Sequence, residues 1–210
     1  MHLSYMSFHT FSVKPVKFFF TFLVFFATCN CVSAQEIKMN YKVKKGDKVI
    51  GAFSVFENTS GTVKTIKLQS HINTSFVVDI TVDAAEQSVF QNGTVIESSI
   101  YRKVNGNIKA NKKHRAFGNG YIISATGKTD TVYNRKITYN LMCLYATEPV
   151  NITKVYADNY EKFLAIKKDE PHSYRVDIPD GSYNVYFYAN GKCTKVEIHQ
   201  SLYTVTMVLS

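Results

Sequence analysis

The stretch IKLQSHI, residues 66–72, decides the fold class of this chain. In an extended strand Ile66, Leu68 and Ile72 fall on one face, while a lysine, a glutamine and a histidine fall on the other. This period of two predicts a β-strand with one buried and one solvated face. The same alternation recurs in other segments: residues 76–84, 183–187, 194–198 and 203–209.

Turn dipeptides separate these runs at short, even intervals. They are Gly46-Asp47, Ser60-Gly61, Asn92-Gly93, Asn105-Gly106, Asn119-Gly120, Asp180-Gly181 and Asn190-Gly191. Asn-Gly and Asp-Gly accept the positive φ angles of tight hairpins, so the spacing predicts an all-β antiparallel meander. Because open twisted sheets rarely exceed about 10 strands, we expect the sheet to curl into a flattened or partly open barrel.

One segment, residues 138–148, lacks turn residues and breaks the strand pattern. Thr138 can cap a helix start and Pro149 ends the run. We therefore expect one short helix around residues 139–148, packed against the sheet or plugging one end of it.

The N-terminal segment predicts export. Lys14 and Lys17 precede an apolar run over residues 18–27, and Val32-Ser33-Ala34 supplies small residues for a signal peptidase. We expect a signal peptide over residues 1–34, cleaved between Ala34 and Gln35. Translation starting at Met6 would shorten the long lead before the charges.

Two alternatives for this segment stay open. An uncleaved anchor needs about 20 apolar residues, and the run ends well before that. A lipoprotein would carry its lipid on Cys29 or Cys31, but the residues before these cysteines fit a lipidation motif poorly. No later stretch is long and apolar enough to predict a transmembrane helix.

Removal of the signal would leave residues 35–210 as a single β-rich domain located in the periplasm or cell envelope. Its formal charge falls from +9 to +7, because the signal holds two lysines and no acids. A basic exported module suits anionic glycans or lipid head groups, although charge also serves solubility alone. Export argues against a nucleic-acid partner, and the sequence does not indicate an oligomeric state.

Two cysteines, Cys143 and Cys193, remain after cleavage and can pair in an oxidising compartment. In a regular strand Cys193 would lie on the solvated face. Either the helix that carries Cys143 covers that patch and the two form a disulfide, or a bulge after Asn190-Gly191 turns Cys193 inward. The sequence leaves both alternatives open.

The titratable residues predict no cofactor and no metal site. No two of the histidines have metal-ligand spacing with each other or with a cysteine, so we interpret them as surface residues. They are His71, His114, His172 and His199.

The sharpest enzymatic hypothesis is a hydrolase with Cys143 as nucleophile, His172 or His199 as base, and Asp169 or Asp177 orienting the base. No glycine-bearing turn surrounds Cys143, and its neighbours Met142 and Leu144 indicate packing. We therefore expect a protein that is not an enzyme.

A basic run occupies residues 109–115. Its charged members are Lys109, Lys112, Lys113, His114 and Arg115. A solvated hairpin explains it, and an anionic envelope polymer is the alternative partner.

Several short motifs spread over residues 44–197 resemble a family of exported proteins. They are KKGDKVIG (44–51), VFQNG (89–93), YRKVNG (101–106), TYNL (138–141), EPV (148–150), PDGSY (179–183) and NGKCTKVE (190–197). The chain resembles the family DUF6134 of Bacteroidetes and, more distantly, the envelope family DUF3108. The resemblance implies a bacterial source, an envelope location and a curled β-sheet, and it supplies no activity and no binding residue.

We expect a non-enzymatic β-barrel-like module that binds an apolar or amphipathic ligand, such as a lipid, in a groove lined by Phe and Tyr. The alternative is a structural or interaction protein with a filled core that docks an envelope partner. An interior hollow above roughly 300 Å³ would favour the ligand, and interdigitated side chains would favour the interaction role.

Overall fold

The computed structural model describes residues 35–75 and 79–210, which form fourteen strands and one short helix. The first eight strands are β1 (Gln35–Lys45), β2 (Lys48–Ser60), β3 (Val63–Ser75), β4 (Asp79–Gln91), β5 (Thr94–Val104), β6 (Asn107–Phe117), β7 (Gly120–Ala125) and β8 (Lys128–Val132). The helix α1 (Cys143–Ala146) precedes β9 (Lys154–Ala157), β10 (Lys162–Glu170), β11 (Ser173–Asp177), β12 (Tyr183–Ala189), β13 (Lys192–His199) and β14 (Thr204–Leu209).

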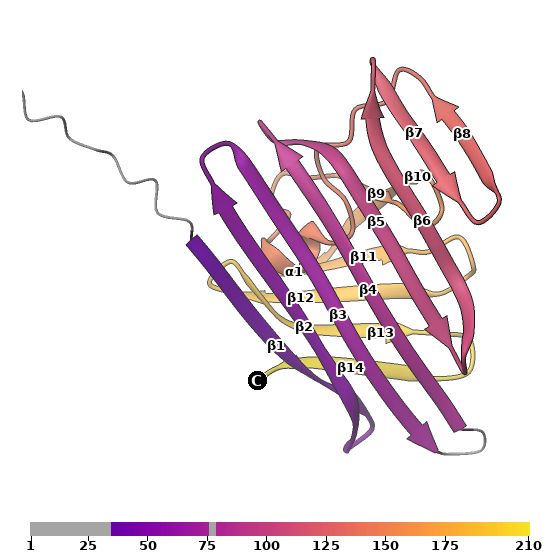
Figure 1. The fold of residues 1–210 in the computed structure, drawn as a ribbon. Helices are drawn as coiled ribbons and strands as arrows, with labels where there is room; N and C mark the ends of the chain where they lie inside the picture. The colour runs from indigo at the N-terminus through magenta and orange to yellow at the C-terminus, as the bar shows by residue number, and fades with distance from the viewer. Residues whose placement is uncertain (1–34, 76–78) are drawn as a thin grey trace, which may run out of the picture. The chain divides into compact units, whose positions relative to one another are not determined.

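All fourteen strands belong to one antiparallel sheet in the order β8-β7-β6-β5-β4-β3-β2-β1-β14-β13-β12-β11-β10-β9. The first strand pairs with the last, so β8 and β9 are left as the two edges and the sheet is not closed into a barrel. Strands β1 to β7 form one layer, and β9 to β14 run across it on the other side of α1 (Figure 1). The predicted all-β, partly open architecture is confirmed.

The alternation in β3 has the predicted orientation. Ile66 and Leu68 are buried, whereas Lys67, Gln69 and His71 are exposed. The predicted strand over residues 76–84 is described only from Asp79, where β4 begins, because residues 76–78 lie outside the described part.

Three Asn-Gly dipeptides form the predicted hairpins, whereas the turn between β6 and β7 lies at Gly118-Asn119, one residue before the predicted Asn119-Gly120. Asn92, Asn105 and Asn190 take left-handed φ values of 49°, 47° and 51°, which asparagine accepts more readily than most residues. Further turns, at Gly127, Glu161 and His172, were not predicted from the sequence; these residues also have positive φ.

The helix is shorter than the interval around which it was predicted. Its N-cap is Met142, without a side-chain cap, so the prediction that Thr138 caps it is wrong. The residues before α1 pair with β9 instead: Tyr156 N donates to Tyr139 O at 2.9 Å, and Leu141 N donates to Tyr156 O at 3.0 Å. These backbone bonds hold the segment extended and leave one turn of helix.

Aromatic side chains fill the space between the two layers. The Tyr145 ring of α1 lies 4.8 Å from Phe53 of β2 and 5.5 Å from Tyr186 of β12, and Tyr41 of β1 also packs against it. Tyr188 donates its hydroxyl to Leu144 O at 2.6 Å. The helix therefore joins the two layers through packed rings.

The predicted signal peptide, residues 1–34, lies outside the described residues, and so do the alternatives at Cys29 and Cys31. Gln35, the residue after the predicted cleavage position, begins β1. Among the helices of the described part, none has the length and apolar character needed to cross a membrane.

Candidate functional site

A row of polar side chains crosses the inner face of the sheet. Ser88 of β4 lies opposite Ser98 of β5, which lies opposite His114 of β6. All three are buried, with exposed fractions of 2% or less. Because side chains alternate along a strand, this row lies one residue away from outward-facing positions on each of the three strands.

Two residues from the other side of the core complete this cluster. Asn140 donates from Nδ2 to Ser88 Oγ at 2.7 Å and to Asp158 Oδ2 at 3.1 Å. Ser98 donates to Asp158 Oδ1 at 2.5 Å. We call Ser88, Ser98, His114, Asn140 and Asp158 the buried polar cluster; it joins β4, β5 and β6 to the segments on either side of β9.

His114 is the least satisfied member of the cluster. Neither ring nitrogen has a hydrogen-bond partner, and Nδ1 lies 4.0 Å from Asp158 Oδ1. The ring packs edge-on against Tyr156, with centroids 5.9 Å apart. Burial lowers the pKa of His114 to about 4 and raises the pKa of Asp158 to about 6, against the hydrogen bond from Ser98. Each shift disfavours the charged form.

Two cationic side chains form hydrogen bonds with the turn that follows β9. Lys112 of β6 donates to Glu161 Oε1 at 2.6 Å and to Asn159 O at 2.7 Å. Arg135 donates to Glu161 O at 3.1 Å and to the Tyr156 hydroxyl at 3.2 Å. These contacts hold the turn that contains the buried Asp158 in place. We therefore interpret the cluster as a structural crosslink between β4 to β6 and the segments beside β9.

The structure does not assemble the residues of the cysteine-nucleophile hypothesis. The Cys143 thiol donates to Asn140 Oδ1 at 3.4 Å, and burial raises its pKa to about 11. A thiol with a raised pKa stays protonated at neutral pH and is a weak nucleophile.

The proposed bases and orienting acids have other surroundings. His172 bonds Glu148 at 3.0 Å, and His199 bonds Glu197 at 3.2 Å and stacks on Tyr183. Asp177 pairs with Lys167 and Arg175, and Asp169 is exposed on β10.

Cys193 follows the bulge alternative. Tyr188 pairs with Cys193, whereas Phe187 pairs with Lys195, so Thr194 is an extra residue in β13. The shift turns Cys193 inward, where it is fully buried. Cys143 and Cys193 are both free thiols in the structure, and the possible disulfide between them stays a prediction.

His114 corrects the interpretation of the histidines as surface residues. His71 and His172 are exposed, but His114 is fully buried. The basic run is likewise split by the strand: Lys113 and Arg115 face outward, while Lys112 and His114 face inward. Among the described residues, no group of three His, Cys, Asp or Glu side chains is placed to hold a metal ion.

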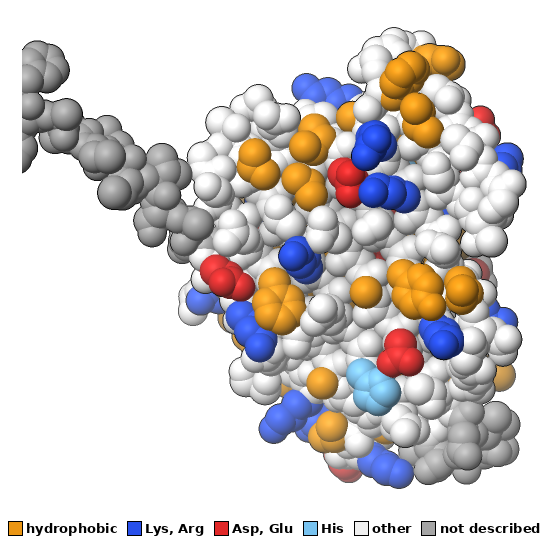
Figure 2. Space-filling model, viewed as in Figure 1, with side chains coloured by type: hydrophobic (Ala, Val, Ile, Leu, Met, Phe, Trp, Pro, Cys, Tyr) orange, Lys and Arg blue, Asp and Glu red, His pale blue; other side chains and the backbone are white. Residues whose placement is uncertain are grey.

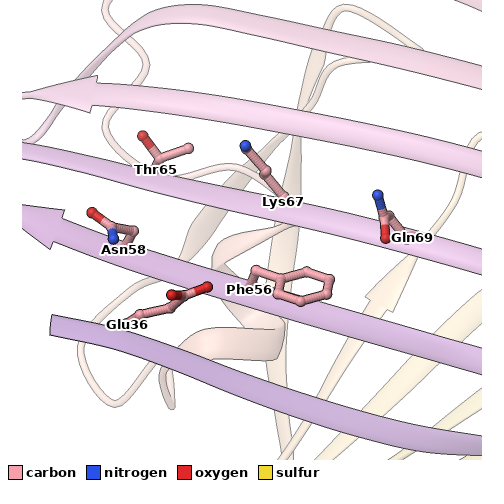
Figure 3. A pocket seen from close by; sticks show the side chains of 6 residues that line it. All are labelled: Glu36, Phe56, Asn58, Thr65, Lys67 and Gln69. Carbon is pink, nitrogen blue, oxygen red and sulfur yellow. The ribbon is translucent and has the colours of Figure 1, made fainter.

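A hollow of about 430 Å³ lies on the outer face of β1, β2 and β3. Figure 3 shows its lining side chains projecting from the three strands. They are Glu36, Phe56, Asn58, Thr65, Lys67 and Gln69. The Lys38 ammonium lies 5.1 Å from the centre of the Phe56 ring. We call this the β1–β3 hollow; one aromatic ring, two amides and charges of both signs suit a polar ligand.

A second hollow of about 300 Å³ lies on the outer face of β6 and β7. Its lining is Lys113, Arg115, Ile122 and Ser124. Figure 2 shows the outer face that carries β1 to β6, with cations, acids and apolar side chains scattered over it. We call this the β6–β7 hollow. Both hollows differ from the expected groove, because most residues that line them are polar or charged and none is a tyrosine.

The sequence matches the family described as domain of unknown function DUF6134 over residues 41–210. The chain belongs to the DUF6134 family. The match starts in β1 and runs to the last residue, so it covers nearly all of the described sheet. No curated protein matches the sequence.

Among solved structures, the fold is similar to a β-barrel-like protein of the domain of unknown function DUF1849 from Brucella abortus. The TM-score is 0.55 at 8% sequence identity, and the likeness covers 84% of this chain and 96% of the other. At this identity the likeness shows the fold alone.

Proposed function

We propose that this DUF6134 protein is a non-enzymatic, exported module of a bacterial cell envelope that docks a partner on the outer face of β1 to β7. The observation that carries the proposal is the contrast between its two faces. The inner face packs against α1 and the rings around Tyr145, whereas the outer face holds both hollows.

The filled interior supports the interaction role over the apolar-ligand role. Fully buried side chains of both layers and of α1, including Tyr41, Tyr156, Tyr186 and Leu144, lie in the interior where a lipid would have to bind. A protein interior that is close-packed with its own side chains has little room for a ligand without repacking. A non-enzymatic role is supported by the protonated, buried thiol of Cys143 and by the structural partners of Asp158.

Native mass spectrometry tests the interior. Protein purified from its own envelope should have the mass of the mature chain alone, because the core is occupied by its own side chains. A retained lipid would overturn the filled-core proposal. The same mass would locate the N-terminus and test cleavage before Gln35.

Co-sedimentation with isolated envelopes tests the outer face. We expect Phe56→Ala, in the β1–β3 hollow, to lower the sedimented fraction several-fold. Leu202→Ala is the control, because Leu202 is an exposed apolar residue between β13 and β14, outside the face formed by β1 to β7, and lines neither hollow. Equal sedimentation of both variants and the wild-type chain would contradict docking on this face.

A further inference from the structure

We propose that the two hollows are the ends of one binding track for an extended anionic polysaccharide, running across the strands on the outer face. This inference rests on the proposed function, since it names the partner that the outer face would dock. Register, charge and lining chemistry support it independently of the family.

Strand register places the two hollows on the same line. One cross-strand row consists of Lys38, Phe56, Lys67, Gln87, Ser99 and Lys113, each the direct partner of the next. It enters the β1–β3 hollow at Phe56 and the β6–β7 hollow at Lys113. The register shifts in β4–β5 and β5–β6 fall outside these pairs, so the row is unbroken.

A second row runs beside the first. It consists of Asn58, Thr65, Val89, Glu97, Arg115 and Ile122, again as direct partners. Asn58 and Thr65 line the β1–β3 hollow, and Arg115 and Ile122 line the β6–β7 hollow. We call the two rows together the outer track.

The length of the outer track favours a polymer over a small molecule. Neighbouring strands lie about 4.8 Å apart, so the four steps from β2 to β6 span about 19 Å. A ligand that fills both hollows must be extended along this direction. Linking two weak contacts in one chain then raises affinity through effective concentration.

Charge favours an anion. Lys38, Lys67, Lys113 and Arg115 contribute four cations, and Glu36 and Glu97 are the nearby acids. Glu97 already pairs with Lys113 at 3.3 Å. Each hollow therefore offers a cation that is exposed to solvent, Lys67 in one and Arg115 in the other.

The polar lining favours a carbohydrate. Asn58, Gln69 and Gln87 present amides that both donate and accept hydrogen bonds, and Thr65 and Ser99 add hydroxyls, which match the hydroxyl groups of a sugar chain. Phe56 supplies one apolar ring surface beside Lys67. A carboxylated sugar chain satisfies the amides, the ring and the cations together.

Titration with oligogalacturonates tests the track. The wild-type protein should bind an oligomer long enough to span both hollows more tightly than the disaccharide, and neutral dextran much more weakly. Lys67→Gln and Arg115→Gln should each weaken binding of the long oligomer about fivefold, and together about 25-fold. The matched control is Lys162→Gln, which removes an exposed charge from β10 and leaves the track intact.

The outcomes separate this inference from the proposed function. If Lys67→Gln weakened binding of the long oligomer and Arg115→Gln did not, the continuous track would be overturned and a single binding hollow would remain. Binding of dextran as tight as that of the oligogalacturonate would overturn the anionic polysaccharide and leave docking on this face. The same conclusion would follow if no oligogalacturonate bound while Phe56→Ala still lowered envelope association. Envelope association insensitive to Phe56→Ala would overturn the proposed function itself.

Discussion

Two rows of polar residues lie back to back in the middle of the sheet. On the inner face are Ser88, Ser98 and His114; on the outer face, one residue away in each strand, are Gln87, Ser99 and Lys113. The inner side chains are buried and the outer ones are at least partly exposed. Both rows consist of polar side chains. The difference in burial therefore separates a row that stabilises the fold from a row that is accessible to a partner.

The comparison predicts that mutations in the inner row and its partners act on stability. Asn140→Ala should have the largest effect, because it removes the donor to Ser88 and Asp158 and the acceptor for Cys143. Leaving buried polar groups unsatisfied costs about 1 to 3 kcal/mol each, so we expect a loss of about 4 kcal/mol in the free energy of unfolding, measured by urea denaturation.

Gln87→Ala is the control for that measurement. Its side chain lies on the outer face opposite Lys67 and Ser99, and we expect a change within about 0.5 kcal/mol. Similar losses for Asn140→Ala and Gln87→Ala would remove the distinction between the two rows.

The second prediction concerns pH. The pKa of Asp158 is raised to about 6 in the folded protein, so above pH 6 its buried negative charge lowers the free energy of unfolding by the full amount. This destabilisation disappears as the pH falls towards 4, because the folded protein takes up a proton at Asp158. The pKa of His114 is lowered to about 4 in the folded protein, so between pH 6.5 and pH 4 the unfolded chain binds a proton at His114 and the folded protein does not. The free energy of unfolding therefore decreases as the pH falls through this interval. Each effect amounts to about 3 kcal/mol, and they oppose each other.

Variants separate the two contributions. Relative to the wild-type chain, Asp158→Asn should lose stability between pH 6.5 and 4, and His114→Gln should gain it over the same interval. Denaturation curves at several pH values give both slopes. Parallel pH profiles for the three proteins would show that neither group is shifted as its burial implies.

The third prediction uses the two thiols. Burial raises the pKa of Cys143 to about 11 and that of Cys193 to about 12, so alkylation of the native protein should be far slower than alkylation in denaturant. Mass spectrometry of the denatured, unreduced chain of residues 35–210 should then count two modified cysteines. A count of zero would establish the disulfide instead.

The inner cluster shows how far sequence reasoning reaches. Alternation places Ile66 and Leu68 correctly because most side chains on their face of β3 between residues 66 and 72 are apolar. The sequence did not predict that His114 is buried, because His114 stands in a basic run and its own face of β6 combines Ala110 with Lys112, which makes the apolar signal on that face weak. Asp158 lies after a four-residue strand, and its burial depends on Ser98 and Asn140, which are distant in sequence.

The outer track could not be predicted from the sequence either, for a different reason. Its members are ordinary strand residues, and they align only through the register of six strands. That register depends on where extra residues fall, as between Val89 and Phe90 or between Arg102 and Lys103. At Cys193 the sequence allowed a bulge as one of two alternatives, and the extra residue Thr194 realises it.

The smallest expected effect belongs to the outer row. Lys113 pairs with Glu97 at 3.3 Å, but both side chains are substantially exposed, at 51% and 34%. Exposed pairs contribute at most about 1 kcal/mol and weaken with salt, so Lys113→Gln should change the free energy of unfolding by less than about 0.5 kcal/mol at moderate ionic strength. A loss comparable to that of Asn140→Ala would mean that the outer row also stabilises the fold, and its charge would then be weaker support for a bound partner.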